Sequence, residues 1–346
     1  MAEKIIARPD HVRAAAARLT GIHAATVAPL APAAVAPGAP DALAPGAPGA
    51  LATGTPGADG GLTLDEGALA AHLAAVCAEP RIRGLLINGH AGENAQMPLA
   101  EKRRVVEIAR QATPPGTFLT SGVYSEATAE AAAHARAMEE AGADAILVFP
   151  PNGWALGHDT RTALDHHAAI AAATGLPLVL YQAPMLAGRI AYSLETLEAL
   201  VRLPSVAGVK EGSWEVARYE ENWRMLSRIA PEVAVMASGD EHLLTSYLIG
   251  TVGSQVSLAA VVPGLVCDLW EAAAAGRWEA ARAHHERLYP LAALIYRGRT
   301  GFEAGARLKA CLKLLGIIPS GAVYAPNRET TPDVDEALKP LLQRLV

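Results

Sequence analysis

Lysine is rare in this chain, and one lysine stands where an amine could react. The 29 basic residues include only six lysines, so the other 23 are arginines. An arginine stays protonated in a protein, whereas a desolvated lysine can become a neutral nucleophile. Lys210 ends the apolar run Val206–Lys210, where its amine could attack a carbonyl group and form an imine. A structural role, with the amine reaching solvent or pairing with Glu211, fits the residue type equally well.

A tyrosine ends the preceding apolar run. Tyr181 closes the run Pro177–Tyr181, one helical stretch before Lys210. Its phenol could move a proton between a substrate oxygen and solvent. The alternative is a core tyrosine whose hydroxyl has a protein partner.

A glycine-rich turn follows an earlier apolar run, Gly84–Asn88. It reads Gly89-His90-Ala91-Gly92-Glu93. Backbone amides in such a turn can hold an anion, and Glu93 would support the turn rather than react. His90 could act as an acid, a base or a hydrogen-bond donor, because the pKa of a histidine lies near neutrality; a structural role is about equally expected.

No pattern indicates a metal or a cofactor. The adjacent pairs His166-His167 and His284-His285 lie in helical stretches, where neighbouring side chains diverge. No glycine-rich phosphate motif is found. The three cysteines are odd in number and far apart, which favours a reducing cytoplasm over a disulfide framework.

Composition limits the function classes. The 346 residues are 51% hydrophobic and 18% charged, so a large core can form and disorder of the whole chain is excluded. The net charge of −6 offers no basic excess for nucleic acid. No apolar run reaches about 18 residues without Pro, Gly or a charge, so we expect no membrane span.

Short apolar runs alternate with amphipathic helical stretches along most of the chain. Eight such repeats predict a closed (β/α)8 barrel, whose active-site residues lie at the carboxyl ends of its strands. The predicted strands are Ile22–Val27, Gly84–Asn88, Thr117–Gly122, Ala145–Phe149, Pro177–Tyr181, Val206–Lys210, Val233–Ser238 and Gln255–Ala259.

Residues 21–276 are predicted to form the barrel. Residues 1–20 form an N-terminal extension with a short helix, and residues 277–346 form a C-terminal helical region. Within the barrel, residues 31–61 are a low-complexity Ala/Pro/Gly insertion with two copies of an eight-residue pattern. We expect a mobile loop that lies over or beside the catalytic end of the barrel.

Four motifs in order resemble the dihydrodipicolinate synthase and N-acetylneuraminate lyase family of class I aldolases. They are Gly89–Glu93, Tyr181-Gln182-Ala183-Pro184, Gly208–Ser213 around Lys210, and Ser238-Gly239-Asp240-Glu241. The resemblance implies a barrel that forms a homotetramer and binds a 2-oxo acid, often pyruvate. It implies a Schiff base on Lys210, a proton shuttle at Tyr181, and a substrate carboxylate held at Gly89–Gly92, with Gly239 also near the substrate.

The chain departs from the family pattern around the expected substrate. His90 and Ala91 replace two hydroxyl residues of the turn, and Gln255 takes a position that is usually aliphatic and faces the substrate. Leu186 stands where the synthases have an arginine, although Arg189 follows three residues later. Asn152 and the residues on either side of it stand where the synthases have paired tyrosines. The resemblance therefore implies imine chemistry on a substrate other than that of a true dihydrodipicolinate synthase.

Three functions remain open from the sequence. The first is an aldolase or lyase that makes or breaks a carbon–carbon bond next to a 2-oxo acid, with an aldehyde as the second substrate or product. The second is a dehydratase of a 2-keto-3-deoxy sugar acid that uses the same lysine imine. The third is an inactive ligand-binding barrel.

Overall fold

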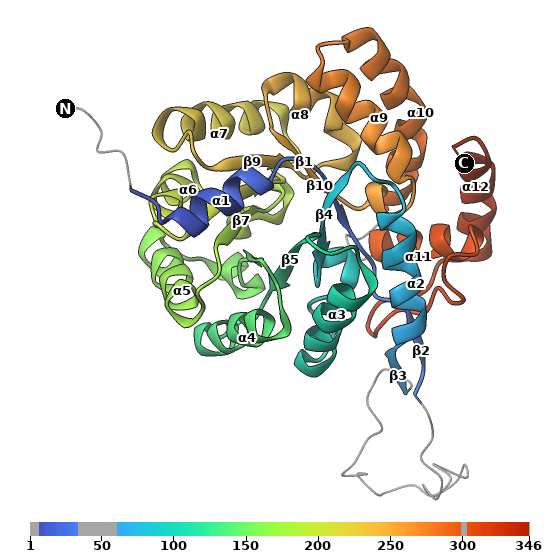
Figure 1. Ribbon diagram of the computed structural model, residues 1–346, viewed down its shortest axis with the longest axis horizontal. Helices are drawn as coiled ribbons and strands as arrows, with labels where there is room; N and C mark the ends of the chain where they lie inside the picture. Colours follow the sequence, from blue (N-terminus) through green and yellow to red (C-terminus); the bar gives the residue numbers. More distant parts are fainter. Residues whose placement is uncertain (1–6, 34–60, 299–302, 346) are drawn as a thin grey trace, which may run out of the picture.

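The apolar runs form a closed parallel barrel. The structure, a computed structural model, describes residues 7–33, 61–298 and 303–345. In barrel order the strands are β1 (Gly21–Ala25), β10 (Gly253–Val256), β9 (Ala234–Ala237), β8 (Val206–Glu211), β7 (Leu178–Gln182), β6 (Ala145–Val148), β5 (Phe118–Val123) and β4 (Ile82–Ile87). β4 pairs with β1 and closes the barrel, as Figure 1 shows. The predicted (β/α)8 fold is confirmed.

The last strand differs from its predicted bounds. β10 begins at Gly253 and ends at Val256. It therefore starts two residues before the predicted strand and ends three residues before it. The apolar residues Leu258–Ala260 form a short 3-10 helix, η5, and are buried beneath α9. A short apolar run does not by itself distinguish a strand from a buried helical turn.

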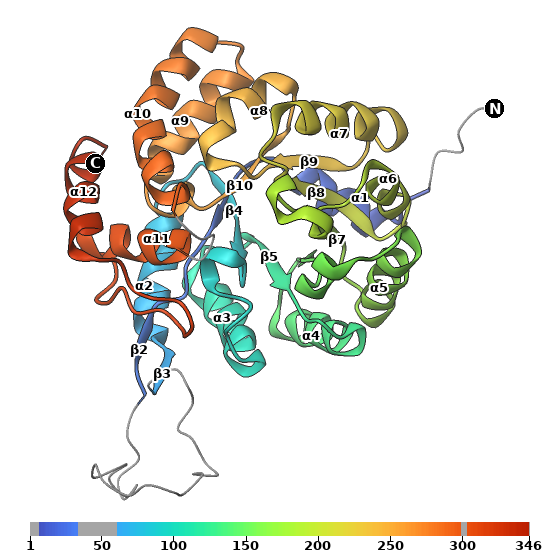
Figure 2. The ribbon, with the colours of Figure 1, turned by 180° about the vertical axis from the view of Figure 1, so that it is seen from behind.

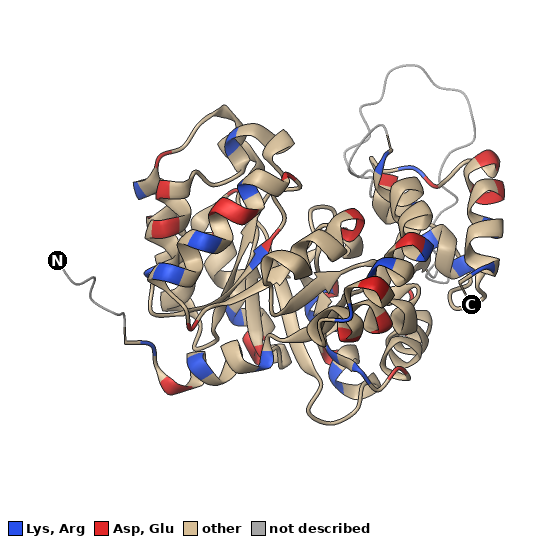
Figure 3. Cartoon of the chain, turned by 90° about the horizontal axis from the view of Figure 1, so that it is seen from above, with Lys and Arg blue, Asp and Glu red and all other residues tan. Residues whose placement is uncertain are grey.

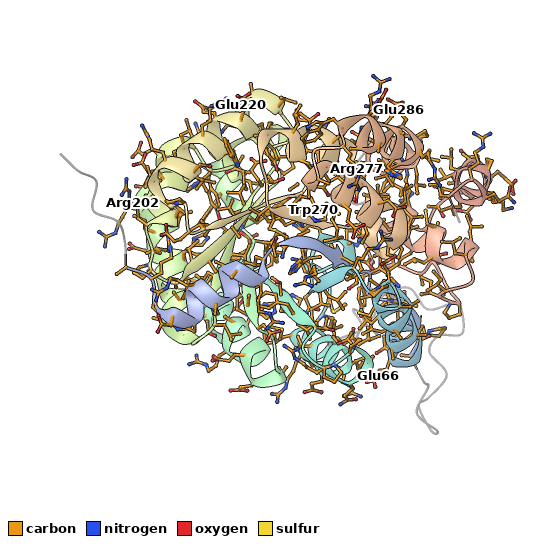
Figure 4. The ribbon with its side chains drawn as sticks, turned by 45° about the horizontal axis from the view of Figure 1, so that its top comes forward. Glu66, Arg202, Glu220, Trp270, Arg277 and Glu286 are labelled. Carbon is orange, nitrogen blue, oxygen red and sulfur yellow. The ribbon has the colours of Figure 1, made fainter. Side chains whose placement is uncertain are left out.

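Helices surround the barrel because its strands are apolar on both faces. They are α2 (Glu66–Cys77), α3 (Leu99–Ala112), α4 (Thr128–Ala141), α5 (Thr160–Ala173), α6 (Leu194–Val201), α7 (Val216–Ile229), α8 (Leu243–Ile249) and α9 (Pro263–Ala274). Charges of both signs mix over these helices in Figure 3. In Figure 4, Glu220 of α7 and Glu286 of a later helix point away from the barrel. No helix of the described residues is long and apolar enough to cross a membrane.

The amino end of the barrel is closed by a helix. α1 (Asp10–Arg18) lies across this end in Figure 1. Val12, Ala15 and Leu19 belong to the same buried cluster as interior residues such as Phe118 and Ala145. Because this end is filled by apolar side chains, a ligand must approach from the carboxyl ends of the strands.

The C-terminal region is less helical than predicted. It contains α10 (Trp278–Tyr296), α11 (Glu303–Leu314) and α12 (Pro332–Gln343), which Figure 2 shows beside the barrel. Residues 315–331 between α11 and α12 form neither helix nor strand. This stretch contains Pro319 and Pro326, which cannot donate the hydrogen bonds of a continuing helix.

The predicted insertion begins and ends in a small hairpin. β2 (Leu30–Pro32) pairs antiparallel with β3 (Leu62–Leu64), so Ala31 and Pro32 belong to a strand rather than to a loop. The hydroxyl of Thr63 donates a hydrogen bond to Glu101 of α3 at 2.9 Å, which attaches the hairpin to the barrel. The rest of the insertion, residues 34–60, lies outside the described residues.

Candidate active site

A cavity of about 610 Å³ opens at the carboxyl ends of the strands. Short 3-10 helices after several strands contribute to its wall: η1 (His90–Gly92), η2 (Asn152–Leu156), η3 (Met185–Ile190) and η4 (Asp240–His242). The C-terminal region forms another part of the wall through α10, α11 and the stretch 315–331. Lys210, Tyr181, His90, Ala91, Gln255 and Asn152 all line this cavity, so the chain brings six of the predicted site residues together.

Lys210 has an amine suited to nucleophilic attack. β8 places it inside the barrel, where 8% of the residue is exposed. Burial lowers the pKa of Lys210 to about 8, while the nearby Asp240 carboxylate opposes part of this shift. Roughly a tenth of the amines are therefore neutral at pH 7. Nζ lies 5.5 Å from the centre of the Tyr181 ring, on the neighbouring strand β7.

A second buried lysine shows that pKa alone does not define the site. Lys102 of α3 is 6% exposed, and burial lowers its pKa to about 8 as well. Lys102 does not line the cavity, whereas Lys210 does. Location in the cavity, rather than pKa, distinguishes the two amines.

The lowered pKa of Lys210 predicts a pH profile for imine formation. Only the neutral amine attacks a carbonyl, so the rate rises with pH and levels off above about pH 8. Well below that pH, the rate should rise about tenfold per pH unit. Trapping of a 2-oxo acid with cyanoborohydride between pH 6 and 9.5 measures this rate. Lys102→Met should leave the profile unchanged, and an inflection near pH 10.5 would contradict the prediction.

Tyr181, whose ring lies beside Lys210, belongs to a cluster of three aromatic rings. The His90 ring lies 4.3 Å from that of Phe149 and 5.2 Å from that of Tyr181, measured between centres. Burial, with a smaller effect from Glu211, raises the pKa of Tyr181 well above its usual value. The phenol therefore keeps its proton at neutral pH and can donate it.

His90 is neutral, which corrects the expectation of a pKa near neutrality. The residue is exposed at the cavity, and its ring packs against the rings of Phe149 and Tyr181. Desolvation by the neighbouring protein atoms, together with the nearby Lys210 charge, lowers the pKa of His90 below its usual value. The imidazole can donate or accept a hydrogen bond at neutral pH, but it carries no charge that would attract a carboxylate.

Two backbone amides of the glycine-rich turn are free for a ligand. Gly92 donates its amide hydrogen to the Gly89 carbonyl at 3.0 Å, and Glu93 donates to the His90 carbonyl at 3.0 Å. Among the described residues, no protein acceptor binds the amides of His90 and Ala91. These two amides, and not that of Gly92, can bind an anion at this turn.

Glu93 supports the turn from behind, as its position predicts. Its carboxylate forms an ion pair with Lys309 of α11, and both side chains are fully buried. It also accepts hydrogen bonds from the Tyr324 amide at 2.9 Å and the Asn327 side chain at 3.2 Å. The carboxylate is therefore fully engaged with the C-terminal region.

Gln255 adds a polar group to the barrel interior. The residue is completely buried on β10, and its Nε2 lies 3.4 Å from the Thr120 hydroxyl. Its Oε1 has no partner among the described residues. A polar atom left unpaired in a cavity wall favours a ligand that supplies a donor.

Three predicted residues do not line the cavity: Gly92, Arg189 and Gly239. Arg189 of η3 is exposed, and its guanidinium lies 3.5 Å from the Leu156 carbonyl on η2. Gly239 lines a separate, smaller cavity together with Trp214 and His242. Leu186, at the position of the synthases' arginine, is 96% exposed at the cavity rim.

The cavity also contains functional groups that were not singled out from the sequence. Asp240 of η4 is buried, which raises its pKa to about 6, and it accepts a hydrogen bond from the Leu258 amide at 2.8 Å. The sequence did contain a signal for Asp240, because the residue belongs to a motif at the end of a predicted strand. Tyr296, at the end of α10, carries no such signal because it reaches the site through packing of the C-terminal region.

No metal site is evident in the described part of the chain, where no group of three or more His, Cys, Asp or Glu residues could hold an ion. The chemistry of the cavity is that of an amine, a phenol, a neutral imidazole and a carboxyl group.

The closed barrel, with a buried lysine at a strand end, defines a class of (β/α)8 enzymes whose site lies at the carboxyl ends of the strands. The sequence matches the Dihydrodipicolinate synthetase family over residues 58–345, and the chain belongs to that family. The family consists of lyases of the class I aldolase superfamily, so the chain is an enzyme of the lyase class.

Individual relatives agree with this assignment. The chain is 31% identical to an uncharacterized DapA-like lyase of Halobacterium salinarum, over 80% of this chain and 87% of the relative. It is 32% identical to 4-hydroxy-tetrahydrodipicolinate synthase 1 of Streptomyces coelicolor, over 72% and 79% of the two chains. The crystal structure of a dihydrodipicolinate synthase from Agrobacterium tumefaciens superposes with a TM-score of 0.77 at 25% identity, covering 96% of this chain and 99% of the other.

Proposed function

We propose that this protein is a Schiff-base aldolase or lyase that acts on a 2-oxo acid through an imine at Lys210. The observation that carries the proposal is the buried Lys210 amine, with its pKa lowered to about 8, in the same cavity as the protonated phenol of Tyr181. An imine of this kind acts as an electron sink, so carbon–carbon chemistry next to the former carbonyl needs no cofactor.

The proposed reaction begins when the neutral amine of Lys210 attacks the carbonyl carbon C2. Tyr181 passes protons to the departing oxygen, which leaves as water, and an iminium remains. In the cleavage direction, the phenolate left on Tyr181 takes the proton of the C4 hydroxyl and the C3–C4 bond breaks. The bonding electrons move into the iminium, an enamine forms and an aldehyde departs. Protonation of the enamine at C3 and hydrolysis of the imine then release the shortened 2-oxo acid.

The turn after β4 supplies the proposed carboxylate site. The amides of His90 and Ala91 would donate hydrogen bonds to the carboxylate of the 2-oxo acid. The neutral His90 ring would add a hydrogen bond without adding charge. Gln255 would contact the substrate through its unpaired Oε1.

The substrate that we propose is larger than pyruvate and differs from that of a true dihydrodipicolinate synthase. A cavity of about 610 Å³ lies in the range of pockets for ligands of drug-like size, so pyruvate would fill only part of it. No arginine is among the described residues of its wall, because Arg189 lies elsewhere and Leu186 occupies the expected position. The wall instead carries side-chain amides such as Asn94 and Gln96, which suit a neutral, hydroxylated substrate chain.

This substrate preference predicts the order of trapping efficiencies. A 2-oxo acid with a hydroxylated chain should be trapped at roughly 5- to 30-fold lower concentration than pyruvate, because it gains one or two hydrogen bonds worth about 1 kcal/mol each. Half-saturating concentrations under cyanoborohydride measure the order, and an unsubstituted 2-oxo acid of equal chain length is the control. Equal values for all three acids would contradict the preference.

A dehydratase of a 2-keto-3-deoxy sugar acid is the second candidate, and Asp240 is the observation that favours it. Its raised pKa of about 6 leaves part of this buried carboxyl protonated near neutrality, where it could protonate a departing hydroxyl. Product analysis separates the two functions. An aldehyde with a shorter 2-oxo acid identifies the aldolase, whereas an unshortened acid that has lost water identifies the dehydratase.

We also propose a homotetramer in the cytoplasm. Leu156 of η2 and Leu186 of η3 are 91% and 96% exposed on two 3-10 helices that pack against each other, and a subunit contact would remove them from water. The cysteines Cys77, Cys267 and Cys311 are free thiols, as in a reducing compartment. Sedimentation velocity tests the assembly.

A further inference from the structure

The C-terminal region is bonded to the turn that carries the free amides. α11 packs directly on η1, and the ion pair between Lys309 and Glu93 joins them across 216 positions of sequence. Lys309 also donates a hydrogen bond to the Ala322 carbonyl at 2.8 Å. One lysine thus connects the turn, α11 and the stretch 315–331 at a single buried point.

The backbone of the turn depends on Glu93. This residue adopts a left-handed conformation with φ of 55°, which is uncommon for a residue with a side chain. Its amide closes the turn on the His90 carbonyl, and the Asn94 amide donates to the Gly89 carbonyl at 3.3 Å. A shift of the Glu93 side chain would therefore also shift the amides of His90 and Ala91, which lie three and two residues before it in the same turn.

We infer that Lys309 and Glu93 are positioning residues, through which the C-terminal region orients the two amides that bind the substrate carboxylate. The inference rests on the proposed function, because it needs a 2-oxo acid at Lys210. Neither residue contacts the reacting atoms in this scheme. Their role is to hold the His90 and Ala91 amides in the direction in which the carboxylate accepts hydrogen bonds.

Two carbonyl compounds distinguish positioning from general support of the fold. Pyruvate and acetone can both form an imine with Lys210, but only pyruvate has a carboxylate for the turn. In Lys309→Met, the second-order rate constant for cyanoborohydride trapping of pyruvate should fall roughly 5- to 30-fold, the effect of one or two misplaced hydrogen bonds. The constant for acetone should change by less than about twofold. Lys339→Met, which breaks the exposed pair with Glu336, is the matched control and should change neither constant.

A second variant covers the case in which Lys309→Met does not fold. Asn327→Ala removes one hydrogen bond from Glu93 and leaves the buried ion pair in place. It should lower the pyruvate constant by a smaller factor, again without an equal effect on acetone. Equal losses for both ketones, or no loss for pyruvate in a folded variant, would overturn the inference. Failure of the wild-type protein to form an adduct with any 2-oxo acid would instead overturn the proposed function, and the positioning role with it.

Discussion

Lys210→Arg should lose turnover by a factor on the order of 10⁴ to 10⁶, the scale seen when the nucleophile of a covalent enzyme is removed. A guanidinium stays protonated and cannot attack a carbonyl, even in a cavity that lowers the pKa of the lysine to about 8. The measurement is steady-state turnover of the preferred 2-oxo acid, together with circular dichroism to show that the barrel is intact.

Lys102→Arg is the matched control for this variant. Lys102 is as buried as Lys210 and has a similarly lowered pKa, but it lies on α3 and outside the cavity. Its substitution should reduce stability without reducing turnover per folded molecule. Turnover within about tenfold of the wild type in Lys210→Arg would show that another group performs the attack.

Tyr181→Phe should fold normally and lose turnover by a factor of roughly 10² to 10⁴, the usual contribution of general acid–base catalysis. The substitution removes only the hydroxyl, and the ring keeps its packing against Phe149 and His90. Imine trapping should persist at a lower rate, because the amine of Lys210 is unchanged.

Tyr192→Phe provides the comparison for Tyr181. Tyr192 is also fully buried, and its hydroxyl lies 3.1 Å from Nε2 of His167, away from the cavity. Removal of this hydrogen bond should cost about 1 kcal/mol of stability and leave turnover unchanged. If both variants retain wild-type turnover, Tyr181 only packs against its neighbours.

The fold could be predicted from the sequence because the strands of a parallel barrel are buried on both faces. Each strand is therefore a short apolar run that a helical stretch separates from the next. The same regularity placed Lys210 and Tyr181 at strand ends. The rarity of lysine then identified Lys210 as a candidate without knowledge of its surroundings.

Features that depend on tertiary packing could not be predicted. Lys309 is one of the six lysines, but nothing near it in the sequence indicates a partner 216 positions away. Tyr296 reaches the cavity only because α10 folds back against the barrel. The lowered pKa of His90 depends on desolvation by neighbouring atoms and on the Lys210 charge, which its residue type alone does not indicate. Arg189 follows a family motif closely in sequence, but the backbone kinks at Gly188 just before it. The Arg189 side chain lies next to η2.

The most direct test of the account is to locate the reduced imine in the wild-type protein. The protein is treated with borohydride and a 2-oxo acid, digested and mapped by mass spectrometry. An imine at Lys210 predicts one adduct per chain on that residue, and none on the other five lysines: Lys4, Lys102, Lys309, Lys313 and Lys339. An adduct on any other lysine, or the absence of an adduct with every 2-oxo acid tested, would contradict it.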